Sequence, residues 1–265
     1  MNRDVSARIV LNIGETADLV FAIAVAAQHP REAERFTATL GGEPVDVVEL
    51  ADAHGTRLHR LTAPPGELVV EYSATVSGTA EPDTADETEL LVYSRPSRYA
   101  ESDSLAPTAG AEFRGIEDPA QLLGAVASWV GTRLAYVSGS SLPTDGATRT
   151  LLARQGVCRD FAHLSVALLR ALGIPARLVS VYAPGLSPMD FHAVAEAWVD
   201  GGWRVVDATT LAPRQALVRI ATGRDAADTA FLNVMSGRAD LVELTVTAVA
   251  DVLPADDVTR LVSIA

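Results

Sequence analysis

Only one cysteine, Cys158, occurs among the 265 residues of this sequence. A single cysteine excludes an internal disulfide framework and the Cys-rich zinc modules. Long apolar runs are missing as well. The best of them, residues 19–27, is far shorter than the roughly 20 residues that a membrane-spanning helix needs, and it lacks the basic start of a signal peptide. We therefore expect a cytoplasmic protein with no membrane association.

Positive charge is scarce. The chain carries 21 Lys and Arg against 34 Asp and Glu, a net charge of -13. A phosphate backbone would be repelled over most of such a surface, so we expect no nucleic-acid partner. What the chain has is hydrophobic content, 48% of residues, which is enough for a large core. The composition leaves the oligomeric state open.

The residues that follow Cys158 have the pattern of an amphipathic helix. Apolar side chains recur at steps of three and four along residues 161–172, and Gly173 and Pro175 stand where the helix should end. Cys158 would then lie in the first turn, where unpaired backbone N–H groups and the helix dipole favour a thiolate over a thiol of pKa about 8.5. A lone cysteine is also commonly a small core residue, so a catalytic interpretation needs partners.

The rest of the chain predicts an α+β protein. Residues 6–77 contain short, β-rich apolar stretches separated by turns, which predicts an antiparallel β-sandwich. We place that N-terminal domain at residues 1–95, a linker at 96–115 and a catalytic core at 116–265. In the core, residues 118–130 predict a helix, residues 134–137 a short strand, and residues 176–183 a strand.

Two partners for the cysteine stand on a predicted hairpin. Residues 192–199 and 203–209 flank Asp200-Gly201-Gly202, a strong signal for a tight turn. With Asp200-Gly201 as the turn, Val199 pairs with Gly202; with Gly201-Gly202 as the turn, the pairing shifts. Either even-numbered loop puts His192 and Asp207 on one face, and the first register makes them diagonal neighbours.

These residues resemble the transglutaminase-like superfamily, in its bacterial branch that joins a papain-like core to an N-terminal β domain. The resemblance rests on GVCRDFAHL at residues 156–164, DFHA at 190–193 and GWRVVDAT at 202–209, with further likeness at 96–103 and 222–228. It implies a Cys helix packed on an antiparallel sheet and a catalytic triad of Cys158, His192 and Asp207.

The resemblance also implies a mechanism. Cys158 would attack an amide of a peptide or protein substrate to form a thioester, with His192 and Asp207 in support and no cofactor or metal. Hydrolysis, as in a cysteine peptidase, is favoured over transglutamination. The Cys158 backbone N–H and Tyr136 are the candidates for the oxyanion site, ahead of Trp129, whose helical position explains it. Further candidates, each one contact removed from the triad, are Asp160, Glu196 and Trp198.

Two other functions stay open: an inactive domain used for binding or assembly, and a metal site built from the three triad residues, which one soft ligand makes less favourable. The remaining polar residues have plainer interpretations. We expect His163 to pack, and Arg224, Asp225 and Asp228 to form an ion-pair cluster. Three histidines are expected at solvated or strand-surface positions: His29, His54 and His59.

Overall fold

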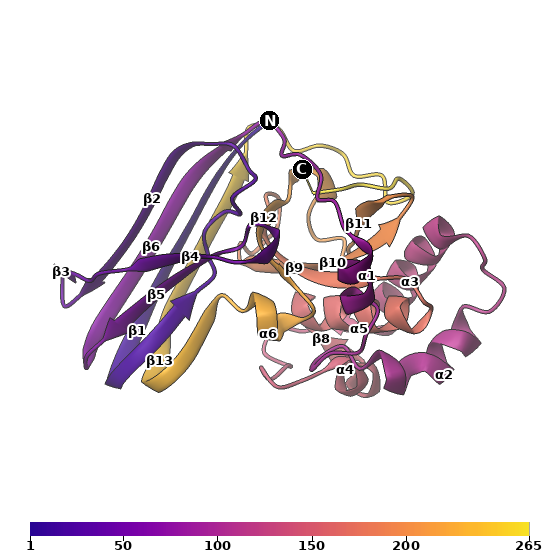
Figure 1. The fold of residues 1–265 in the computed structure, drawn as a ribbon, viewed down its shortest axis with the longest axis horizontal. Helices are drawn as coiled ribbons and strands as arrows, with labels where there is room; N and C mark the ends of the chain where they lie inside the picture. Colours follow the sequence, from indigo (N-terminus) through magenta and orange to yellow (C-terminus); the bar gives the residue numbers. More distant parts are fainter. Residues whose placement is uncertain (265) are drawn as a thin grey trace.

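The computed structural model, which describes residues 1–264, places a stack of long strands beside a mixed part of helices and strands (Figure 1). The long strands form one antiparallel sheet in the order β3-β2-β6-β1-β5-β4, with β13 also paired to β1. The predicted antiparallel, strand-rich N-terminal region is confirmed. Its strands are β1 (Asn2–Phe21), β2 (Arg31–Leu40), β3 (Glu43–Pro44), β4 (Val48–Ala51), β5 (Arg57–Ala63), β6 (Gly66–Ser77) and β13 (Leu232–Ala250).

Strand β1 organises this sheet. It pairs with β6 over residues 2–13 and with β5 over residues 17–21, so the sheet changes partner across Gly14–Thr16. Strand β13 follows β1 along both segments and shifts register opposite the same region. There Gly237 has φ +78°, and a side chain on it would collide with the Thr16 carbonyl oxygen. Glycine at position 237 therefore lets the two backbones stay paired where β1 bends.

The second part is a four-stranded antiparallel sheet in the order β11-β10-β9-β12. Helix α5 packs on β9 and β10, with α2, α3 and α4 around it, and its apolar stripe faces the small buried residues Ala195 and Ala197. A Cys helix on an antiparallel sheet is confirmed. The elements are α2 (Ser102–Glu112), α3 (Pro119–Arg133), α4 (Ala147–Ala153), α5 (Cys158–Ala171), β9 (Ala176–Tyr182), β10 (Phe191–Val199), β11 (Gly202–Val206) and β12 (Val218–Gly223).

The predicted division of the chain needs two corrections. Residues 232–250, assigned to the core, form β13 and pair with β1, because their alternating apolar side chains complete the N-terminal sheet. Residues 96–115, assigned to a linker, contain α2, which buries Leu105 and Ala109 against α5. The N-terminal unit is thus discontinuous in sequence, and the expected linker is part of the core.

A buried group of charges joins three strands of the second sheet to the segment before α1 (Glu87–Tyr93). Glu196 on β10 accepts hydrogen bonds from Arg177 on β9 and Arg219 on β12, and Arg177 also bonds Asp83, just before α1. The carboxylate of Glu196 is fully buried between the two guanidinium groups, which hold its pKa down at about 2 against the opposing effect of burial.

Within residues 1–264, no helix has the length and apolarity to cross a membrane.

Candidate active site

Helix α5 begins at Cys158, as the sequence predicts, and leaves its side chain partly exposed. The start of the helix is fixed by Asp160, whose Oδ2 accepts from the Val157 N–H at 2.8 Å. Its Oδ1 accepts from the Ser141 hydroxyl at 2.9 Å. Asp160 is 1% exposed, so it joins the loop before α4 to the first turn of α5 and positions the cysteine without facing solvent.

The hairpin of β10 and β11 adopts the first of the two registers considered. Val199 pairs with Gly202, and Asp200-Gly201 forms the turn. His192 at the start of β10 and Asp207 just beyond β11 then meet, with His192 Nε2 and Asp207 Oδ2 3.0 Å apart. Both side chains are buried. Local turn chemistry therefore fixed a contact between residues 15 positions apart.

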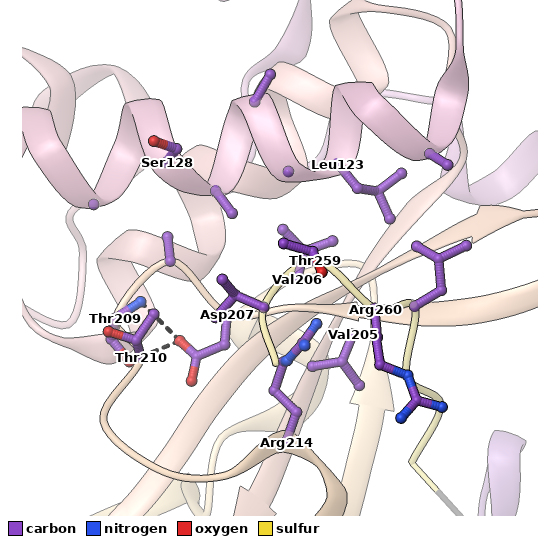
Figure 2. Close-up of a pocket in the computed structure, with 18 of the residues that line it drawn as sticks. Leu123, Ser128, Val205, Val206, Asp207, Thr209, Thr210, Arg214, Thr259 and Arg260 are labelled. Atoms are coloured by element: carbon purple, nitrogen blue, oxygen red, sulfur yellow. Dashed lines mark hydrogen bonds between the residues drawn. The ribbon is translucent and has the colours of Figure 1, made fainter. Parts of the chain in front are cut away.

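Asp207 is held by a neighbour that the sequence interpretation missed. Its Oδ1 accepts from both the backbone N–H and the hydroxyl of Thr209, at 2.8 and 2.7 Å (Figure 2). Burial raises the pKa of Asp207, but His192 and the two Thr209 hydrogen bonds outweigh it and leave the pKa below its ordinary value. A threonine two residues after an aspartate is a recognisable turn signal that could have identified this contact.

The imidazole of His192 has one nitrogen on Asp207 and one free. Nδ1 is buried and makes no hydrogen bond within residues 1–264. Burial alone would lower the pKa of His192, but the Asp207 carboxylate overcomes it, the Cys158 sulfur adds to the rise, and the pKa reaches about 10.

Tyr136 reaches the same place from a short parallel pair of strands. It lies on β7 (Ala135–Tyr136), opposite Gly156 of β8 (Gln155–Gly156). Partial burial raises the pKa of Tyr136 to about 12, with a contribution from the neighbouring Cys158. Tyr136 is therefore brought to the cysteine, whereas Trp129 donates its Nε1–H to Glu112 at 2.8 Å and packs edge-on against Phe113.

Two further candidates are engaged elsewhere. The hydrogen bonds of Glu196 go to Arg177 and Arg219 in the buried charge group, so its role is to hold the sheet together. Trp198 packs edge-on against Trp203, with ring centroids 5.4 Å apart. Sharing a strand face with His192 was therefore insufficient to place either residue in the site.

The histidine predictions need correction. His29 and His59 are buried, 2% and 4% exposed, and so are not solvated. His29 Nε2 accepts from the Arg219 N–H, and His59 stacks on Phe36. His54 contacts the Tyr93 hydroxyl at 2.8 Å. These residues lie in apolar or interdomain contacts that the strand pattern alone does not reveal.

Packing of His163 and pairing of Arg224 follow the predictions. His163 is completely buried, stacks on Tyr99 and accepts the Ala226 N–H at 3.1 Å. Arg224 pairs with Asp228 at 2.9 Å. Asp225, in contrast, leaves the expected ion-pair cluster, since it caps the short α6 (Ala226–Thr229).

A cavity of about 730 Å³ lies beside Asp207, which lines it, between α3 and the segment 258–261 (Figure 2). Its walls are mainly apolar and include Leu123 and Val206. Arg214 at its edge is already paired with Asp256 at 2.9 Å. In the part of the chain that the structure describes, no three His, Cys, Asp or Glu side chains are grouped to hold a metal ion.

Comparisons with known proteins place this chain beside one family. The model of the transglutaminase-like superfamily matches residues 107–208, which include Cys158, His192 and Asp207. The crystal structure of a candidate cysteine protease from Cytophaga hutchinsonii superposes with a TM-score of 0.90 at 33% identity, covering 98% of this chain and 96% of that one.

Mycobacterial relatives are similar over shorter stretches. An uncharacterized Mycobacterium leprae protein is 29% identical over 67% of this chain and 71% of its own length. One from Mycobacterium tuberculosis is 34% identical over 48% of this chain and 45% of its own length. The chain thus spans less than half of the second relative.

Proposed function

Because this chain belongs to the transglutaminase-like superfamily, we propose that it is a thiol enzyme that cleaves amide bonds of peptide or protein substrates through a thioester on Cys158. One observation carries the proposal. His192 is held by Asp207 through Nε2 while its buried Nδ1 has no hydrogen-bond partner among residues 1–264 and the Cys158 sulfur acts on the ring. A fixed imidazole with one nitrogen left for a thiol is what nucleophilic catalysis by cysteine requires.

The chemistry proceeds in two steps. The Cys158 thiolate attacks the amide carbonyl carbon, and the imidazolium of His192 gives its proton to the departing amine as the C–N bond breaks. Water then attacks the thioester, loses a proton to the imidazole, and releases the acid and the thiolate. Asp207 positions the ring and stabilises its charged form. Hydrolysis is the favoured outcome; an amine in place of water would give transglutamination.

The oxyanion of each tetrahedral intermediate would be stabilised by two donors. As the first residue of α5, Cys158 has a backbone N–H without an intrahelical acceptor. The Tyr136 hydroxyl is the second donor, since it lies beside Cys158 and, like any tyrosine, is protonated at neutral pH. Replacing Tyr136 by Phe should lower kcat by about 10²- to 10³-fold while leaving labelling of the thiol intact, and single-turnover acylation kinetics would measure it.

The first experiment measures the rate of Cys158 alkylation by iodoacetamide from about pH 5 to about pH 9, around the ordinary thiol range near 8.5. We expect fast labelling that persists to low pH in the native chain and loses this advantage in His192→Ala. Trp198→Phe is the matched control and should label as the native chain does. Slow labelling that ignores His192 would contradict the proposal and favour the inactive binding domain.

A further inference from the structure

An acidic side chain that the proposed mechanism does not use lies beside the triad. Asp190 directly precedes β10 and stands two residues before His192. Between them, the Phe191 ring packs with Tyr182 and Phe231, with ring centroids 5.5 and 5.4 Å away, on the strand face opposite His192. Because side chains alternate along an extended chain, Asp190 lies on the same side as His192.

The Asp190 carboxylate acts on groups at both walls of the site. Burial raises the pKa of Asp190, and the Phe191 N–H and the His192 imidazole only partly offset that rise. On the other wall, partial burial and Cys158 raise the pKa of Tyr136, and the charge of Asp190 adds to the effect. Together with the strand alternation, these interactions place Asp190 between the imidazole and the Tyr136 hydroxyl.

Asp190 has no cation paired with it. Its Oδ1 accepts from the Phe191 N–H at 2.7 Å, and among residues 1–264 neither oxygen forms an ion pair with Lys, Arg or His. Arg159, the residue after Cys158, is engaged elsewhere and donates to the Leu142 carbonyl at 2.8 Å. Asp190 is also exposed. A carboxylate that is open to solvent, partly desolvated and without a counter-charge beside a nucleophile is suited to bind a cation.

The loop that carries Asp190 is fixed to the rest of the core. Leu186 is only 7% exposed and anchors the loop by its side chain. Gly185 has φ +99°, and a side-chain carbon on it would lie 3.0 Å from Pro213 Cδ, so the two backbones pack closely. Met189, which is 46% exposed, adds an apolar surface next to the carboxylate. Asp190 is therefore presented from an anchored loop.

We propose that Asp190 determines specificity by pairing with a Lys or Arg side chain of the substrate, on the residue whose carbonyl Cys158 attacks or on the residue before it. This inference rests on the proposed function and narrows its substrate class to polypeptides with a basic residue beside the cleaved amide. The acyl side of the amide is favoured because Asp190 acts on Tyr136, the candidate donor to the carbonyl oxygen. The net charge of -13 adds long-range attraction for the same substrates.

Thiol reagents of similar size and different charge test the site without a known substrate. Methanethiosulfonates transfer an ethylammonium or an ethylsulfonate group to the sulfur of Cys158, the single cysteine, as a disulfide forms and methanesulfinate leaves. Asp190→Asn keeps an oxygen that can accept from the Phe191 N–H but removes the charge. We expect the ratio of cationic to anionic labelling rates to fall about tenfold in this variant, because Asp190 attracts one reagent and repels the other. A change in the reactivity of the thiolate itself cancels in the ratio.

A second aspartate supplies the matched control. Asp46 is exposed and follows β3, the strand at the outer edge of the stack, away from the helical part (Figure 1). Asp46→Asn removes the same charge and should leave the ratio at the native value. Asp190→Glu, which restores the charge, should restore most of the ratio. An unchanged ratio in Asp190→Asn, or an equal fall in Asp46→Asn, would overturn the proposal.

Dipeptidyl chloromethyl ketones measure the same contact in a chain that resembles a substrate. They alkylate Cys158 with loss of chloride, and lysine, norleucine or glutamate is placed at either of their two residues in turn. At one of these positions, we expect lysine to give labelling about tenfold faster than norleucine, with glutamate slowest. Asp190→Asn should remove this preference, and Asp190→Lys should reverse it in favour of glutamate. No preference for lysine at either position, or a preference that survives in Asp190→Lys, would overturn the proposal.

The outcomes also separate this inference from the proposed function. His192-dependent labelling of Cys158 by iodoacetamide, together with a charge ratio that ignores Asp190, leaves the thiol enzyme in place and removes the specificity assignment. A charge ratio that depends on Asp190, without any dependence of labelling on His192, retains a cation-binding residue beside the cysteine and removes the catalytic proposal.

Discussion

At the scale of residues, the candidate site depends on which atom of each side chain is already occupied. Thr209 occupies Oδ1 of Asp207, which leaves Oδ2 for His192 Nε2, and this in turn leaves Nδ1 for the thiol. Asp207 and Thr209 thus fix the tautomer and the orientation of the His192 imidazole in the absence of substrate.

Disrupting the hydrogen bonds from Thr209 to Asp207 and from Asp207 to His192 should reduce catalysis without removing the nucleophile Cys158. Asp207→Asn keeps the shape of the side chain but lets the amide donate to the ring, which favours the wrong tautomer. We expect kcat to fall by about 10³- to 10⁴-fold, as for the corresponding change in serine protease triads. Thr209→Val should lower it less, and Thr209→Ser, which keeps the hydroxyl, should restore it. Comparable activity in Asp207→Asn and the native chain would contradict the assignment.

The His192–Asp207 pair should also make stability depend on pH. The pKa of His192 is raised to about 10 in the folded chain, against the ordinary 6.5. Its contribution is therefore complete below about pH 6.5 and is lost as the pH rises through about 10. The unfolding free-energy difference between the native chain and His192→Gln, measured in urea, should shrink over that window. The lowered pKa of Asp207 works in the opposite direction, so its contribution is lost at low pH.

At the scale of elements, the start of α5 is set by contact between Gly156 and Asp160. A side-chain carbon on Gly156 would lie 2.6 Å from the Asp160 Cβ, closer than real contacts allow. Asp160 cannot retreat easily, because its oxygens hold Val157 and Ser141. The glycine thus gives the carboxylate room to cap the helix that carries Cys158.

A pair of glycine substitutions tests this restriction. Gly156→Ala should destabilise the chain by about 1–3 kcal/mol, in the range of overpacking. Gly110→Ala in α2, where an added carbon meets nothing within 4 Å, should stabilise it by about 0.5–1 kcal/mol through helix propensity. Urea denaturation measures both, and loss of stability in both variants would mean that Gly156 has no special role.

Elements defined by local patterns were predictable. The helix under Cys158 follows from a 3.6-residue apolar period, and the turn at Asp200-Gly201 fixed the register that joins His192 to Asp207. Side chains committed to distant partners were not predictable. Glu196 lies on the expected strand, but its two arginine partners come from β9 and β12, and no sequence spacing links them.

At the scale of the whole molecule, the buried charges hold together β9, β10, β12 and the segment before α1. Arg219→Met would leave the buried carboxylate of Glu196 with only one of its two guanidinium partners, which should cost about 3–5 kcal/mol of unfolding free energy. Arg224→Ala removes an exposed pair with Asp228 and should cost less than about 1 kcal/mol. Equal costs in thermal or urea unfolding would show that the buried group adds nothing beyond a surface pair.

The position of β13 could not be predicted from the sequence either, because its partner strand is distant along the chain. An alternating apolar pattern indicates a strand, but it does not identify the neighbour, and β13 follows the core in sequence while pairing with β1. The burial of His29 has the same origin, since it depends on contact with β12 across the boundary between the two parts.

This pairing also orders events during synthesis. Arg3 is opposite Ala250 in the finished sheet, so β1 is made well before β13 and waits for it before both of its edges are covered. The residues of α5 and of β9 to β12 are all made in that interval, and their contacts span far shorter stretches of chain. We expect the helical part to fold first and the strand stack to close slowly around β13, as non-local pairing requires.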